Sequence, residues 1–321
     1  MGDHNLTGTY GRGLMSLVIT GLLGLSFGCG NRNQVSSVEA SVKQPEPTTS
    51  AEPKSGESKS VDPQVQSEID KAESEKRATL LKDAQSAIDE TRNAVAALDK
   101  GDKDAALQAL SRVTGKLDLV ISRDPKLALA PVAVSTTIFD LYTNADTVKT
   151  VVKQAKDDLS SNQVQQARSL LTYLASEADI HVTELPLATY PGAIKAVAPL
   201  IDAGKIDEAK AALVTVLNTL AIETYIIPLP QVRAEAMLAV ADSLAAKNGR
   251  TPDDNTKVRA LIDGARNEIK FAEALGYGTK DDYKPLYAQL DDVQKKIDGG
   301  QSGKGLFGKL RQSIKNFKFA S

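Results

Sequence analysis

Apolar residues recur at helical spacing from about residue 77 towards the C-terminus, and this pattern restricts the fold more than any other feature. In the first such stripe Ala84, Ile88, Val95 and Leu98 follow one another at steps of four, seven and three before Gly101. These steps place the residues on one face of a helix that ends near the glycine. The chain is also rich in strong helix formers and has no tryptophan. We therefore expect an all-α domain of eight or nine helices and no strand.

Helix boundaries are marked by local signals. A second helix is expected to end before Asp124 and Pro125. Thr251 has the character of an N-cap, followed by Pro252 at the first helical position, and this helix ends at Gly276. A final helix is expected to end at the glycine pair of residues 299 and 300.

A short pattern occurs three times and predicts tight helical hairpins. In each copy an apolar helix end is followed by a residue that tolerates left-handed backbone, and then by a helix with a small alanine for close packing. The spacing between copies is irregular, which favours a compact bundle of antiparallel hairpins over an open solenoid. The three copies are Leu98, Gly101, Ala106 and Leu110; Leu159, Asn162, Ala167 and Leu171; and Ile201, Gly204, Ala209 and Leu213.

The N-terminus resembles a bacterial lipoprotein signal. Leu14 to Phe27 carries no charge and is about 21 Å long as a helix, short of the roughly 30 Å of a bilayer core. Gly28 and Cys29 follow, as in a lipobox, so residues 1–28 are interpreted as the signal peptide and Cys29 as the lipidation site. The alternatives are a buried cysteine in a core helix or cleavage further on. Gly30 after the cysteine hints at the outer membrane, and the expected location is the periplasmic face of the cell envelope.

Residues 29–74 are dominated by Ser, Pro, Glu and Lys and contain no aromatic residue. Such a composition buries too little apolar surface to offset conformational entropy. We expect a disordered tether between the lipid anchor and a helical domain at residues 75–300.

The segment ETYIIPLPQVRAEAM has the most distinctive local chemistry of the chain. It is expected to be a helix that Pro228 and Pro230 kink or break. Together with GKIDEAKAAL before it and the LDKGDKDAALQAL hairpin, it resembles the YfdX family of bacterial exported proteins, over roughly residues 77–270. The resemblance implies an all-helical periplasmic domain tied to stress tolerance, with proposed chaperone-like or small-molecule-binding activity and no established reaction.

A ligand site is expected, if anywhere, at the proline-broken corners. A broken helix leaves unpaired carbonyls and a groove beside it. The second corner is ELPLATYPGAIKAVAP, residues 184–199, which could form the opposite wall. The alternative is that both corners are rigid turns between helices, with the tyrosines packed against them. The candidate ligand-binding residues are Tyr190, Tyr225, Pro228, Pro230 and Arg233.

Catalysis is not expected. His181 would be the one histidine left after signal cleavage, and its scattered acidic neighbours do not make a metal site, so a structural or surface role is favoured. The sequence has no phosphate-binding glycine loop, serine-nucleophile elbow or CxxC pair, which predicts no catalytic residue, no metal and no cofactor. The 39 basic and 41 acidic residues nearly cancel, so nucleic acid is not an expected partner.

The C-terminal tail, residues 301–321, is basic and amphipathic, with no acidic residue. It is typical of a helix lying on a membrane surface or docking on a partner. The alternative is a terminal helix whose apolar side packs on the bundle. The residues assigned to a membrane surface are Phe307, Lys309, Leu310, Arg311, Ile314, Lys315, Phe317 and Lys318.

The leading functional hypothesis is a non-catalytic, membrane-tethered protein of the cell envelope. As the resemblance implies, it would bind exposed apolar segments of client proteins or a small molecule. The alternative is a scaffold lipoprotein that links a membrane to a partner through its basic tail. Assembly into a homo-oligomer is left open.

Overall fold

The structure, a computed structural model, describes residues 54–317. The helical class predicted from the sequence is confirmed, with one small antiparallel sheet of three strands in the order β1-β2-β3 added to it. The helices are α1 (Gly56–Ser60), α2 (Asp62–Arg77), α3 (Lys82–Asp99), α4 (Lys103–Arg123), α5 (Ala145–Ser160), α6 (Val164–Leu171), α7 (Tyr190–Lys195), α8 (Ala198–Asp202), α9 (Ile206–Leu217), α10 (Leu229–Ala245), α11 (Pro252–Leu275), α12 (Lys280–Asp298) and α13 (Leu306–Lys315). The strands are β1 (Leu129–Phe139), β2 (Glu177–Pro186) and β3 (Ala221–Pro228).

The three predicted helical hairpins are confirmed. They are α3–α4, α5–α6 and α8–α9, and the residues between their helices, Gly101, Asn162 and Gly204, have φ values of 74°, 60° and 73°. Asn162 adopts this left-handed conformation without being glycine, as asparagine tolerates better than most residues. The alanines of the second helices are buried, which lets the paired helices approach closely.

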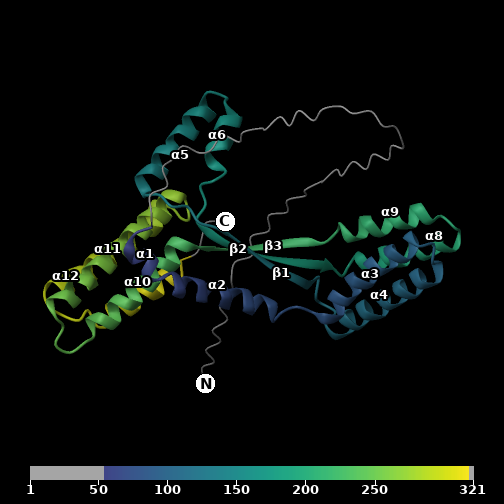
Figure 1. Ribbon diagram of the computed structural model, residues 1–321, viewed down its shortest axis with the longest axis horizontal. Helices are drawn as coiled ribbons and strands as arrows, with labels where there is room; N and C mark the ends of the chain where they lie inside the picture. The colour runs from purple at the N-terminus through teal and green to yellow at the C-terminus, as the bar shows by residue number, and fades with distance from the viewer. Residues whose placement is uncertain (1–53, 318–321) are drawn as a thin grey trace, which may run out of the picture.

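The helices pack around two separate hydrophobic cores instead of one. We call the group formed by α3, α4, α7, α8 and α9 the α3 lobe, and the group formed by α2, α10, α11, α12 and α13 the α10 lobe. Figure 1 shows the lobes at opposite ends of the molecule with the sheet between them. The expected compact bundle is therefore divided in two, because each lobe buries its own apolar stripes.

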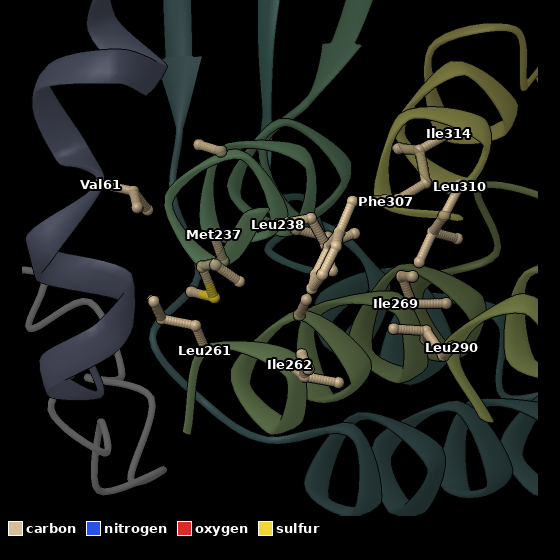
Figure 2. Close-up of a cluster of buried hydrophobic side chains, with 14 of the residues drawn as sticks. Val61, Met237, Leu238, Leu261, Ile262, Ile269, Leu290, Phe307, Leu310 and Ile314 are labelled. Atoms are coloured by element: carbon tan, nitrogen blue, oxygen red, sulfur yellow. The ribbon is translucent and has the colours of Figure 1, made fainter. Parts of the chain in front are cut away.

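The core of the α10 lobe is formed by side chains from all of its long helices. Figure 2 shows Met237 and Leu238 of α10 facing Ile262 of α11, with Phe307 of α13 beside them. The predicted start of α11 is confirmed: Thr251 and Asp254 form a capping box, and Gly276 ends the helix with φ of 87°.

Residues 54–74 correct the predicted tether. Instead of being disordered, this segment forms α1 and most of α2, because Val61, Val65 and Ile69 lie four residues apart and bury one stripe in the α10 lobe. Residues 29–53, with Cys29, and the predicted signal peptide at residues 1–28 lie outside the described residues. In the described range 54–317, none of the helices combines the length and hydropathy needed to span a bilayer.

The three-stranded sheet contradicts the prediction that the domain contains no strand. All three strands fall in segments that were expected to be helical or connecting, and β3 replaces the first half of the predicted proline-broken helix. Pro228 stands at the end of β3 and Pro230 in the first turn of α10, where a missing amide donor leaves no intrahelical hydrogen bond unmade. The two prolines therefore separate a strand from a helix and do not kink one helix.

Candidate functional site

One face of the sheet is covered by α2. Thr136 of β1 donates a hydrogen bond to Glu73 of α2 over 2.7 Å, and the Lys76 ammonium lies 3.1 Å from the centre of the Tyr225 ring. Val134, Ile180 and Val182 are buried beneath the helix on the same face. Successive side chains of a strand point to opposite faces, so the alternate residues must lie on the other face.

The opposite face of the sheet is open. Register places Ile222, Thr183 and Ala133 in one row, Thr224, His181 and Ser135 in the next, and Ile226, Asp179 and Thr137 in the third. Ile222 is 63% exposed and Ile226 46% exposed. The face is thus a mixture of hydroxyl groups, one carboxylate, one imidazole and two isoleucines that the fold leaves in contact with solvent.

Most of the exposed large apolar side chains belong to the sheet and to the α5–α6 hairpin, which connects β1 to β2. Isolated exposed apolar residues are ordinary on a protein surface, whereas a group of them is typical of a binding surface. Elsewhere only Leu119 and Val214 belong to the same class among the described residues. Those in the region are Ile138 and Phe139 at the end of β1, Tyr142 after it, Leu159, Val164 and Leu171 on the α5–α6 hairpin, Tyr173 after it, and Ile222 and Ile226 on β3; of the two on β1, Phe139 lies on the open face and Ile138 on the other.

A buried ionic cluster lies where the sheet meets the α10 lobe. Arg233 of α10, whose side chain is 4% exposed, donates from Nη2 to both carboxylate oxygens of Asp140 over 2.7 Å. Lys54 contacts Asp140 over 3.1 Å and Asp62 over 3.0 Å. Glu268 of α11 accepts a 2.6 Å hydrogen bond from Ser58, and its Oε2 lies 4.0 Å from Arg233. The cluster connects α1, α2, α10 and α11 to the end of β1.

The two buried carboxylates of this cluster differ in pKa. Burial raises the pKa of Glu268 above its ordinary value, although Arg233 and Ser58 favour its ionised form. Burial acts on Asp140 in the same direction, but the hydrogen bond and charge of Arg233, with those of Lys54, outweigh it and lower the pKa of Asp140. Folding therefore favours the ionised form of Asp140, which pairs with Arg233, and disfavours the ionised form of Glu268.

The replacement Glu268→Gln is expected to stabilise the fold increasingly as the pH rises. A carboxyl whose pKa is raised by folding contributes stability below its ordinary pKa of 4.5 and loses it as the pH rises through the folded value. Glutamine cannot ionise, so urea unfolding at pH 4.5 and pH 7.5 should show the larger gain at pH 7.5. Glu208→Gln, at a carboxylate that is 59% exposed, is the control and should show no such trend. A gain from Glu268→Gln that is largest at pH 4.5 would contradict the prediction.

The structure does not bring the predicted ligand-binding residues together. Tyr190 is buried in the α3 lobe, where its hydroxyl donates to Thr91 over 3.0 Å, as the rigid-corner alternative implied. Tyr225 lies on the covered face of β3, and Pro228 and Pro230 are buried at the strand-to-helix junction. Arg233 alone belongs to a charged site, and that site is the ionic cluster.

The apolar side of the C-terminal tail packs on the protein and does not face a membrane, as the alternative of a packed terminal helix implied. Phe307, Leu310 and Ile314 are buried in the core of the α10 lobe, and Phe317 packs against that core with its ring centre 4.7 Å from that of Tyr283. Arg311 pairs with Glu235 over 2.7 Å, and Lys315 lies 3.5 Å from the same carboxylate. The apolar stripe that suggested membrane binding is thus used inside the protein. Lys309 is exposed, and Lys318 lies outside the described residues.

His181 lies in the middle of the open face, with Nδ1 3.0 Å from the Thr224 hydroxyl. Within residues 54–317 no group of three or more histidine, cysteine or acidic side chains is placed to hold a metal ion.

The residues of the candidate site that were not predicted from the sequence are Ile222 and Ile226, together with Asp140, Lys54 and Glu268. The alternation of Ala178, Ile180 and Val182 was a usable strand signal, whereas no local pattern marks the ionic cluster.

These features define a mainly helical protein of two lobes whose connecting sheet leaves a partly apolar face in solvent. The model of the family described as YfdX protein matches residues 87–226, which is less than half of the chain, so the chain is similar to the YfdX family over this region. The solved structure of Salmonella Typhi YfdX is similar at 14% sequence identity and a TM-score of 0.32, over 47% of this chain and 93% of that chain. No curated protein matches the chain.

Proposed function

We propose that this protein is a non-catalytic, membrane-tethered component of the cell envelope that binds exposed apolar segments of other proteins under stress. One observation carries the proposal: the sheet exposes Ile222 and Ile226 on its open face while α2 covers the other face. The tether and the location are supported by the lipobox-like sequence ending at Cys29.

The open face suits an unfolded segment better than a small molecule. Its isoleucines are separated by the Thr224 row, so contact with both needs a ligand that extends over several residues of β3. The exposed apolar residues of the α5–α6 hairpin offer further contacts beyond the sheet. The hydroxyl groups between the isoleucines allow polar backbone of the bound segment to be hydrogen-bonded at the same time.

Replacing Ile222 and Ile226 together by serine is expected to weaken client binding about tenfold or more. Complete burial of one isoleucine contributes about 1.5–3 kcal/mol, and each of these side chains has a large exposed part left to bury. The measurement is suppression of aggregation of a reduced, unfolding client by the full chain, titrated to the half-maximal ratio.

The matched control replaces Leu119 and Val214 by serine. These side chains are 50% and 46% exposed but lie on α4 and α9, away from the open face. The control should retain wild-type activity. Equal loss in both double variants, or no loss in either, would overturn the assignment of client binding to this face.

A further inference from the structure

Among the residues that the structure describes, β3 is an edge strand with no partner on its outer side. The Leu229 amide donates to the Ser176 carbonyl over 2.9 Å, which fixes the alternation of hydrogen bonds between β2 and β3. In an antiparallel ladder alternate residues point their backbone groups to opposite sides. Ile227, Tyr225 and Glu223 therefore face β2, and the amides and carbonyls of Ile222, Thr224 and Ile226 point outward.

The two edges of the sheet are not equally protected. On β1 the outward carbonyl of Pro131 accepts a 3.0 Å hydrogen bond from the Leu81 amide, and the strand has a bulge between Pro131 and Ala133. These features block strand addition. From Ala221 to Ile227, β3 has no proline, no lysine and no bulge, and none of the described elements pairs with its outer side.

The edge is complementary to itself. In a two-fold pairing centred on Thr224, Ile222 lies opposite Ile226 of the second copy, Thr224 opposite Thr224, and Ile226 opposite Ile222. All of these residues point their backbone groups outward, so both strands are fully hydrogen-bonded over this stretch. Isoleucine–isoleucine and threonine–threonine pairs across strands are favourable.

Charge selects this register over its neighbours. Centring the pairing on Glu223 would place two carboxylates opposite each other, and centring it on Tyr225 would bring together two rings that each carry a Lys76 ammonium. Centred on Thr224, each Glu223 instead lies opposite the Tyr225 of the second copy, close to that copy's Lys76. In its own copy Glu223 already accepts a hydrogen bond from Tyr225 and lies near Lys76, so this register brings a second ammonium group towards each carboxylate.

We propose that two copies of this chain pair through β3 and join their sheets into one continuous six-stranded sheet. The pairing is isologous, as in most symmetric dimers. It uses the backbone edge of β3 and leaves the open face uncovered, so that the isoleucines of both copies form one wider apolar surface. This goes beyond the proposed client binding and does not depend on it.

The test compares Thr224→Lys with Thr224→Val in the detergent-solubilised full chain. Thr224 is exposed, so neither side chain disturbs a core, but lysine places two ammonium groups opposite each other at the two-fold axis. The protein mass from analytical ultracentrifugation should correspond to a dimer for the wild type and Thr224→Val, and fall two-fold for Thr224→Lys. A monomeric wild type, or an unchanged mass in Thr224→Lys, would overturn the proposal.

A second variant tests the register directly. Directly paired residues in a hydrogen-bonded antiparallel pair have Cα atoms about 5.5 Å apart, within the range of a disulfide. Thr224→Cys should therefore form a dimer under mild oxidation, linked between the two introduced cysteines and identified by peptide mapping. Thr137→Cys, at an exposed threonine on β1, should not form such a link. Equal cross-linking of the two variants would exclude pairing through β3.

Discussion

Replacing Arg233 by methionine is expected to lower the free energy of unfolding by about 3–5 kcal/mol, the cost typical of breaking a buried ion pair from one side. The Arg233 side chain is 4% exposed and holds Asp140, which the mutation would leave buried with only Lys54 as a cationic partner. The cost should appear as a lower midpoint in urea, because the cluster joins helices of the α10 lobe to the end of β1.

Two further variants separate the ion pair from general loss of packing. Arg92→Met removes an exposed pair, 63% and 69% exposed on its two sides, and should change stability by about 0–1 kcal/mol. Arg233→Met combined with Asp140→Leu should recover part of the loss, since the unpaired carboxylate is then also absent. If the double variant is no more stable than the sum of the single variants predicts, the two residues are not coupled.

Replacing Phe307 by alanine should also destabilise the protein by about 3–5 kcal/mol. Its side chain is fully buried in the α10 lobe, and Figure 2 places it between Leu238 of α10 and Leu310 of α13. Removal of the ring leaves a cavity that helices fixed on several sides cannot close. Thermal and urea unfolding of the full chain would measure the loss.

Lys309→Ala is the matched control on the same helix. Lys309 is exposed, so the change should stay within about 0.5 kcal/mol. A loss below about 1 kcal/mol for Phe307→Ala would mean that α13 is only loosely attached. The tail would then again be available for the membrane interpretation that its basic, amphipathic sequence suggests.

Helix ends were the most predictable part of this fold. The turn at Gly101, the capping box at Thr251 and the stop at Gly276 depend on local chemistry within a few residues, and all three are confirmed. The α1–α2 segment was missed because its polar composition hid the sparse stripe of Val61, Val65 and Ile69. That stripe packs in a lobe whose other helices begin only with α10, far along the chain.

The strands and the site were harder to predict for physical reasons. β3 ends at Pro228, and Pro230 follows in α10, a spacing that also suits a broken helix. Only the pairing of β3 with β2 decides between a strand and a helix. The ionic cluster joins Asp140 to Arg233 across 93 positions of sequence, so no spacing rule detects it. Arg233 was identified as a candidate, but the charge that gives it a role lies in a different segment.

Each strand of the sheet begins beside one lobe and ends beside the other, and this interleaving limits how the chain can be divided. Neither lobe is a continuous piece of sequence, so no single cleavage yields two fragments that each contain one complete core. A fragment limited to residues 87–226, the family-matched region, would end inside β3 and lack the helices on which β2 and β3 rest at one end. Truncations should therefore retain the chain from α1 to α13.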